Sequence, residues 1–152
     1  MIDQNKVKET QPLNQAMELL HFGYRAFINA ADQILEQQAL GRVHHRILYF
    51  VARDPGIDVA TLRETLAVSK QALHGPLRVL QQAGLVVPTA HPTDKRSRCL
   101  VLSEQGNELE QQVTQAQHKL LKDIFSEHPE ATEHWYFIMR QLAQLETDRD
   151  LG

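Results

Sequence analysis

Turn residues divide the stretch between residues 54 and 102 into short segments, and their order restricts the folds open to the chain. Asp58 and Ser69 each stand just before a short apolar-periodic segment, where an N-cap residue is expected. Gly84 follows the second segment, at the position where a left-handed residue closes a helix. The two segments, at residues 59–67 and 70–83, are therefore predicted to be short helices joined by a tight turn.

A β-hairpin is predicted directly after Gly84. Residues 85–89 (LVVPT) form the expected first strand and residues 99–102 (CLVL) the return strand. Pro88 is tolerable if the first strand lies at an edge. Short helices joined by a tight turn and followed by a two-stranded hairpin describe a winged helix-turn-helix, with the hairpin as the wing. The expected fold class is therefore mainly α with a small β-hairpin wing.

Longer helices are predicted on both sides of this region. The first runs from about Pro12 to Gln38, with Pro12 at the first helical position, where its missing N–H is no loss. Apolar residues along this helix form a seam that steps by four and three residues through Leu13, Met17, Leu20, Tyr24, Phe27, Ala31 and Ile34. A seam of about three heptads packs against another helix; a second chain is the favoured partner, and the chain's own core is the alternative. The other helices are expected at residues 42–53, 104–126 and 130–146.

The composition argues for one ordinary folding unit. Hydrophobic residues make up 42% and charged residues 23% of the 152 residues. No apolar run approaches the roughly 18 residues of a membrane span, and the polar N-terminus has no secretory h-region. A cytoplasmic location without a membrane partner is expected. Cys99 is the single cysteine, which excludes an internal disulfide and a zinc site of several thiolates.

The formal net charge of -3 hides a basic segment. From Ser69 to Arg98 five cations accompany one anion, whereas the remainder carries 11 cations and 18 anions. A phosphate backbone interacts with the local patch and not with the net charge. A basic segment on an acidic body therefore indicates a nucleic-acid reader.

The helix at residues 70–83 has one polar face without a carboxylate and one apolar face. A merely solvated face would mix acids with bases, so this pattern favours a phosphate-lined partner over plain surface. Gln71 is suited to adenine, and Arg78 to guanine or a phosphate. His74 can donate or accept a hydrogen bond, and Lys70 beside the helix N-terminus suits a phosphate.

The tip of the predicted wing carries a second basic group. Lys95, Arg96 and Arg98 would reach the flanking DNA backbone or minor groove; the alternative is a solvated charged loop. Asp94 would be repelled by phosphate unless it holds an arginine or caps the turn, and we expect it to fix Arg96 or Arg98 in place. The candidate DNA-binding residues are thus Ser69, Lys70, Gln71, His74, Arg78, Lys95, Arg96 and Arg98, with Asp94 as wing organiser.

These residues resemble the MarR family of winged-helix regulators. TDKRSRCLVLSEQG is similar to the family's wing signature, and LQQAGLV to the Leu-x-x-x-Gly-Leu-Val that closes its recognition helix. The resemblance implies a homodimer that binds a pseudo-palindromic operator in double-stranded DNA, usually as a repressor released by a small aromatic or anionic ligand. Dimerisation would use residues 1–38 and 104–152, around a DNA-binding region at residues 39–103. Gly75-Pro76 departs from the pattern, and we expect a kink there and not a break, because Pro76 lies on the buried arc.

A candidate ligand pocket between the first helix and the DNA-binding region rests on the same resemblance. In it Arg25 would hold a carboxylate, and Tyr24 or Phe22 an aromatic ring. The alternative is that these residues belong to the dimer core and the surface. The candidate lining residues are His21, Phe22, Tyr24, Arg25, His44 and His45.

Other chemistries find less support in the sequence. His44 and His45 are adjacent on a helix and point about 100° apart, so they cannot chelate one ion from the same face, and no metal or cofactor is expected. Cys99 is expected to be a small buried thiol, and the alternative is that its oxidation disturbs the wing. No catalytic motif stands out, and no enzyme activity is expected. A remaining alternative is a winged-helix protein-interaction module of the antirepressor type, whose basic face binds an acidic protein.

Overall fold

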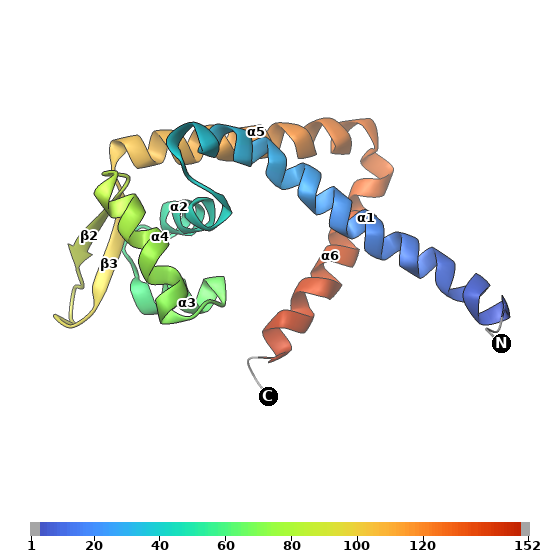
Figure 1. Ribbon diagram of the computed structural model, residues 1–152, viewed down its shortest axis with the longest axis horizontal. Helices are drawn as coiled ribbons and strands as arrows, with labels where there is room; N and C mark the ends of the chain where they lie inside the picture. The colour runs from blue at the N-terminus through green and yellow to red at the C-terminus, as the bar shows by residue number, and fades with distance from the viewer. Residues whose placement is uncertain (1–3, 150–152) are drawn as a thin grey trace. The chain divides into compact units, whose positions relative to one another are not determined.

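The computed structural model describes residues 4–149, and the side chains of residues 10–148. The chain forms two compact units, one that ends at Gln117 and one that begins at His118 within the fifth α-helix. The elements of the chain are shown in Figure 1. In order they are α1 (Gln4–Leu35), the 3-10 helix η1 (Glu36–Gln38), α2 (Arg42–Arg53), β1 (Ile57–Asp58), α3 (Val59–Leu66), α4 (Lys70–Gln82), β2 (Val86–Ala90), β3 (Arg98–Leu102), α5 (Glu104–Glu127) and α6 (Pro129–Arg149).

The caps expected from the sequence define the two short helices. The Asp58 carboxylate accepts a hydrogen bond from the N–H of Thr61 at 2.8 Å, at the start of α3. The Ser69 hydroxyl accepts one from the N–H of Ala72 at 3.1 Å, at the start of α4. Ala83 is the C-cap of α4, and Gly84 after it takes a φ of +71°, in the left-handed region that closes a helix. The predicted helix-turn-helix is thus confirmed, with each helix ending one residue earlier than expected.

The wing is an antiparallel hairpin of β2 and β3, paired from Val86 opposite Leu102 to Ala90 opposite Arg98. Its β2 strand is an edge strand, which is why Pro88 is tolerated. The sequence prediction missed β1, which pairs with the other side of β3. A strand of two residues is too short to show an alternating pattern.

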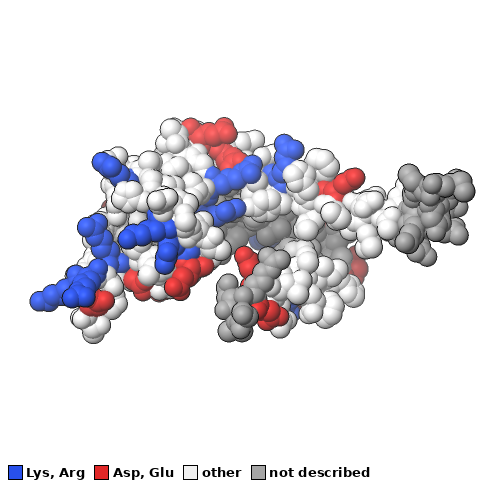
Figure 2. All heavy atoms as spheres, turned by 60° about the horizontal axis from the view of Figure 1, so that its bottom comes forward, with Lys and Arg blue, Asp and Glu red and all other residues white. Residues whose placement is uncertain are grey.

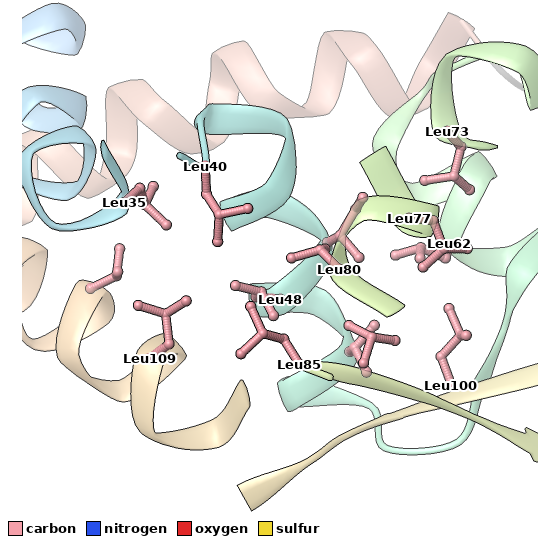
Figure 3. Close-up of a cluster of buried hydrophobic side chains, with 14 of the residues drawn as sticks. Leu35, Leu40, Leu48, Leu62, Leu73, Leu77, Leu80, Leu85, Leu100 and Leu109 are labelled. Carbon is pink, nitrogen blue, oxygen red and sulfur yellow. The ribbon is translucent and has the colours of Figure 1, made fainter. Parts of the chain in front are cut away.

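A cluster of buried leucines lies beneath the helix-turn-helix (Figure 3). Leu73, Leu77 and Leu80 form the inner row of α4 and are at most 8% exposed. Burial of each such side chain contributes about 1.5–3 kcal/mol. Because this row is fixed in the core, the polar side of α4 faces outward. The cluster is completed from other elements by residues that include Leu35, Leu40, Leu48, Leu62, Leu85, Leu100 and Leu109.

An ion pair with one buried partner joins α2 to α5 beside this core. Glu110 is 3% exposed, and its carboxylate lies 3.1 Å from the exposed Arg53 guanidinium. The same Glu110 oxygen accepts a hydrogen bond from the Thr114 hydroxyl at 2.6 Å. Arg53 also stacks over the ring of Tyr49, with its guanidinium carbon 4.3 Å from the ring centroid. Loss of Arg53 would leave the Glu110 charge in a poorly solvated place, so this pair helps to fix the relative position of α2 and α5.

The first helix begins earlier than the sequence suggested. Its range includes Gln4, so Pro12 lies inside α1 and not at its first position. The residues before Pro12 include Lys, Glu and Gln, which are good helix formers, and the helix continues through the one hydrogen bond that proline cannot donate. At the other end of the chain the last helix also begins one residue earlier than expected, with Pro129 as its first residue.

A compact junction joins the end of α4, the end of β3 and the start of α5. The Ser103 hydroxyl donates to the Gly84 carbonyl at 2.6 Å and accepts from the N–H of Gly106 at 3.0 Å. The Ser103 N–H donates to the Leu85 carbonyl at 3.0 Å. A Cβ placed on Gly106 would lie 2.0 Å from that carbonyl oxygen, so only glycine fits at this position. We call these four residues the Ser103 junction.

Gly106→Ala is expected to destabilise the protein, because the new methyl group displaces the Leu85 main chain. The expected loss in unfolding free energy is about 1–3 kcal/mol or more. Urea denaturation followed by circular dichroism measures it. The matched control is Gly23→Ala, a helical glycine of α1 whose added Cβ would meet nothing within 4 Å. Equal stability of Gly106→Ala and the wild-type protein would contradict the close packing described for the junction.

Candidate nucleic-acid interface

The recognition helix α4 carries the predicted polar face intact. Lys70, Gln71, His74 and Arg78 are all exposed, while the leucine row on the opposite side is buried. The helix is continuous from Lys70 to Gln82, so Pro76 does not break it, and Arg78 stays on the same element as Lys70. The helix contains no acidic residue. Four side chains suited to DNA are thus presented together on one outward face.

The apolar face of α4 is less completely buried than its sequence pattern predicted. Ala72 is exposed and Val79 is 43% exposed, although both lie on that face. The leucine row fills the width of the core, so apolar residues at the border of the face remain outside it. The exposed face of α4 therefore combines polar residues with a narrow apolar margin.

The wing tip places its three cations at the surface. Lys95 and Arg96 lie in the exposed turn between β2 and β3, and Arg98 is the first residue of β3 instead of the last residue of the loop. Figure 2 shows Lys and Arg side chains gathered at the hairpin tip. Cys99 follows directly and is 3% exposed, which confirms the expected buried thiol at the start of the return strand.

Asp94 orders this turn through the main chain. Its carboxylate accepts hydrogen bonds from the N–H of Arg96 at 2.9 Å and from the Ser97 hydroxyl at 3.1 Å. In the described residues no ion pair joins Asp94 to the guanidinium of Arg96 or Arg98, so the expectation of a side-chain contact is corrected to a turn cap. These two hydrogen bonds, with that from Arg96 the stronger, hold the pKa of Asp94 below its ordinary value.

Sequence reasoning missed His91, which caps the other side of the wing turn. Its Nδ1 accepts hydrogen bonds from the N–H groups of Thr93 at 3.2 Å and Asp94 at 2.9 Å. The ring therefore fixes the first half of the turn, and Asp94 fixes the second half. The signal in the sequence was the spacing of two and three residues from His91 to the amides it binds, which is that of an Asx-like turn but with a histidine in the capping position.

The candidate ligand-pocket residues lie apart in two groups. His21, Phe22, Tyr24 and Arg25 are exposed on α1, where His21 and Phe22 make an edge-to-face contact with centroids 5.2 Å apart. His44 and His45 are half-buried on α2. Within the described part of the chain, no hydrogen bond or ring contact joins the first group to these two histidines. The two helices are joined instead by Arg46, which donates to the Tyr24 hydroxyl at 3.0 Å, and by the Arg42 guanidinium, which lies 3.3 Å from the Asp32 carboxylate.

The surroundings of His44 and His45 favour the neutral form of each ring. The Nδ1 atom of His44 accepts a hydrogen bond from the Gly41 N–H at 3.0 Å, at the start of α2. Burial lowers the pKa of both rings, and for His45 the nearby carboxylates of Glu110 and Asp32 oppose that shift only in part. The Nε2 atom of His45 and one carboxylate oxygen of Asp32 are buried without a hydrogen-bond partner.

Elsewhere, the second unit contains an open cavity of about 680 Å³ between the end of α5 and α6. It is lined by residues that include His118, Phe125 and Tyr136, and by none of the candidate pocket residues. No group of three or more potential metal ligands occurs in residues that the structure describes. Among those residues, no helix combines the length and apolar character needed to cross a membrane.

Comparison with known proteins identifies relatives that share the helix-turn-helix and the wing. The model of the MarR family matches residues 40–97, from just before α2 to the wing tip. The HTH-type transcriptional regulator PetP of Rhodobacter capsulatus is 42% identical over 115 residues, which cover 76% of this chain and 69% of that protein. The chain belongs to the MarR family. It is a MarR-family transcriptional regulator, as the wing and the recognition helix suggested.

Solved MarR-type structures share the fold of this chain. A Staphylococcus aureus MarR in complex with salicylate and kanamycin matches with a TM-score of 0.76 and 19% identity, over 92% of this chain and 96% of that one. NadR in complex with 4-hydroxyphenylacetate matches with a TM-score of 0.70 and 24% identity, over 83% and 88% of the two chains. The mainly α winged-helix fold expected from the sequence is confirmed by these matches.

The cap at Asp94 has a measurable consequence for its titration. NMR is expected to give this carboxyl a midpoint below the ordinary value of 3.8, and the Arg96 amide should titrate with the same midpoint. The turn bonds persist above that midpoint and disappear as the pH falls through it, because a protonated carboxyl is a weaker acceptor. Ser97→Ala removes one donor and should raise the midpoint. A wild-type midpoint at the ordinary value would refute the cap.

Proposed function

We propose that this MarR-family protein is a homodimeric repressor that binds a pseudo-palindromic operator and is released by a small ligand. The observation that carries the DNA-reading role is the exposed, acid-free face of α4, which lies beside a wing with three cations at its tip. An exposed helix face without carboxylates is the electrostatic complement of a phosphate-lined groove.

The recognition helix α4 and the wing would contact different parts of the DNA. The side chains of Gln71 and Arg78 have the donor and acceptor geometry to read adenine and guanine in the major groove. Lys70 lies in the first turn of α4, whose N-terminus is positive, and suits a phosphate. The wing cations would contact the flanking backbone or minor groove. Ser69 caps the helix through a hydrogen bond that its hydroxyl accepts from the Ala72 N–H, and the O–H of the same hydroxyl would donate to a phosphate.

A second copy of the chain would cover the apolar surface of α1. Leu13, Met17 and Leu20 on the predicted seam are 52–70% exposed, whereas Ala31 near the other end of the seam is buried. The seam is thus filled by the chain's own core at one end only. On α6, Phe137 and Leu145 are each 63% exposed. Both helices therefore present apolar surface of the kind that dimer interfaces bury.

Release by a small aromatic or anionic ligand is proposed from two relatives and from the chemistry of the candidate residues. Salicylate and 4-hydroxyphenylacetate, found with the S. aureus MarR and with NadR, are aromatic carboxylates. Arg25 and the aromatic Phe22 and Tyr24 are exposed on one helix and would suit such a ligand. The unpartnered Nε2 of His45 is a further polar group that a ligand would satisfy.

The DNA-reading role predicts a salt-dependent preference for an inverted repeat. Selection from random duplexes should enrich half-sites about one helical turn apart. Arg78→Ala and Arg96→Ala should each weaken binding by about tenfold or more, and the loss of a phosphate contact should reduce the slope of log K against log salt by about one. The control Lys119→Ala removes an exposed cation from α5 and should bind as the wild type does. Weak, sequence-blind binding that is unaffected by either arginine substitution would indicate an acidic protein partner instead.

The wing cap predicts that an acid supports DNA binding. Asp94→Ala should weaken operator binding by roughly two- to tenfold, the loss expected when an ordering hydrogen bond disappears, although the variant carries one negative charge fewer. Asp94→Asn keeps an acceptor and should bind more tightly than Asp94→Ala. Glu127→Ala, which removes an exposed acid from α5, is the charge control. Tighter operator binding by Asp94→Ala than by the wild-type protein would show that Asp94 acts only through its charge.

A further inference from the structure

Gly75 occupies a position that glycine normally avoids. It lies in the interior of α4, where glycine is less favourable than alanine by about 1 kcal/mol. The backbone does not require it, because the positive-φ glycines of the described chain are Gly56 and Gly84. A reason must therefore be sought in what surrounds the residue.

The chain supplies one local reason: Pro76 follows directly, and the proline Cδ crowds the Cβ that any other helical residue would place there. Beyond its chain neighbours, a Cβ added at Gly75 would meet nothing within 4 Å. Gly106 is the contrasting case, since a Cβ there would collide with the Leu85 carbonyl. Gly75 is also exposed. The space above its Cα is therefore open to a partner that approaches α4 from outside.

The side chains around Gly75 give this open space two unlike sides. Residues three and four positions away on a helix are its surface neighbours. On one side these are Gln71 and Arg78, which belong to the polar recognition face. On the other side they are Ala72 and Val79, the two exposed apolar residues that the core leaves uncovered. We call this space, bordered by these four residues, the Gly75 notch.

The chemistry of the notch selects one kind of occupant. Its floor is the Cα of glycine, and one of its borders is made by the Ala72 methyl group and the Val79 side chain, none of which donates or accepts a hydrogen bond. In the DNA major groove the methyl group that projects from the base edges is the C5-methyl of thymine, which proteins contact with apolar side chains. A methyl group is also small enough to reach the helix backbone where a Cβ is missing.

We propose that the Gly75 notch receives the C5-methyl group of a thymine in each operator half-site, and so makes Gly75 a residue that determines sequence specificity. The proposal rests on the proposed DNA-reading function. Gln71 and Arg78 would then read the base pairs on either side of that thymine, because they border the notch on its polar side. Alanine at position 75 would place its Cβ where the thymine methyl group lies.

The test pairs Gly75→Ala with removal of single methyl groups from the DNA. An operator is first selected with the wild-type protein, and each thymine in it is then replaced in turn by deoxyuracil. For the wild type, replacement of one thymine per half-site should weaken binding by a few-fold. Gly75→Ala should bind the thymine operator at least about tenfold more weakly, and deoxyuracil at that same position should restore most of the loss. Gly41→Ala, which adds a methyl group in open space outside α4, should behave as the wild type does.

Three results would overturn the proposal. The first is that Gly75→Ala binds the thymine operator as tightly as the wild type, and the second is that no deoxyuracil position rescues it. The third is a melting temperature several degrees below that of the wild type together with equally weakened binding to every duplex, which would assign Gly75 to relieving the clash with Pro76. Failure of the underlying DNA-reading function is distinguishable from all three, since the wild-type protein itself would then select no inverted repeat.

Discussion

The Leu85 carbonyl and the Ser103 hydroxyl hold together the three elements on which the DNA-facing surface depends. Leu85 follows the closing glycine of α4 and precedes β2, while Ser103 follows β3 and precedes α5. Their hydrogen bonds therefore fix the end of the recognition helix, both ends of the wing and the start of α5 at one point. Gly106 permits the close approach of α5 that this arrangement needs. The Gly84, Ser103 and Gly106 positions in the family-like motifs thus have a structural reason.

The recognition helix and the wing are ordered by different means from this common base. A buried leucine row fixes the rotation of α4, so its polar face is set by hydrophobic packing. The wing tip has no core of its own, and there the main-chain amides are held by the His91 ring and the Asp94 carboxylate. Because hydrogen bonds at an exposed turn are individually weak, this part of the surface depends more than α4 does on single side chains.

The sequence predicted those features that local rules determine. N-caps at Asp58 and Ser69, the closing role of Gly84 and the wing followed from residue type and spacing, because each depends on residues a few positions apart. The predicted start of α1 at Pro12 was wrong. Proline is common at the first position of a helix, but the helix formers before Pro12 extend α1 to Gln4. The β1 strand and the Ser103 junction were missed because they join residues far apart in the chain. For the same reason the candidate pocket, which combines α1 and α2 residues, stays a prediction.

The recognition helix is also the place where the sequence conflicts most with its own local structure. Gly75 and Pro76 are adjacent in the interior of α4, and each disfavours a helix, proline by about 3 kcal/mol in a plain helix. The helix nevertheless continues to Gln82, because the leucines before and after this pair are anchored in the core. Because core packing stabilises α4, residues on its exposed side need not be good helix formers. They can instead be residues that suit a DNA partner. A helix stabilised by its own propensity would have neither the open space at Gly75 nor an apolar margin left outside the core.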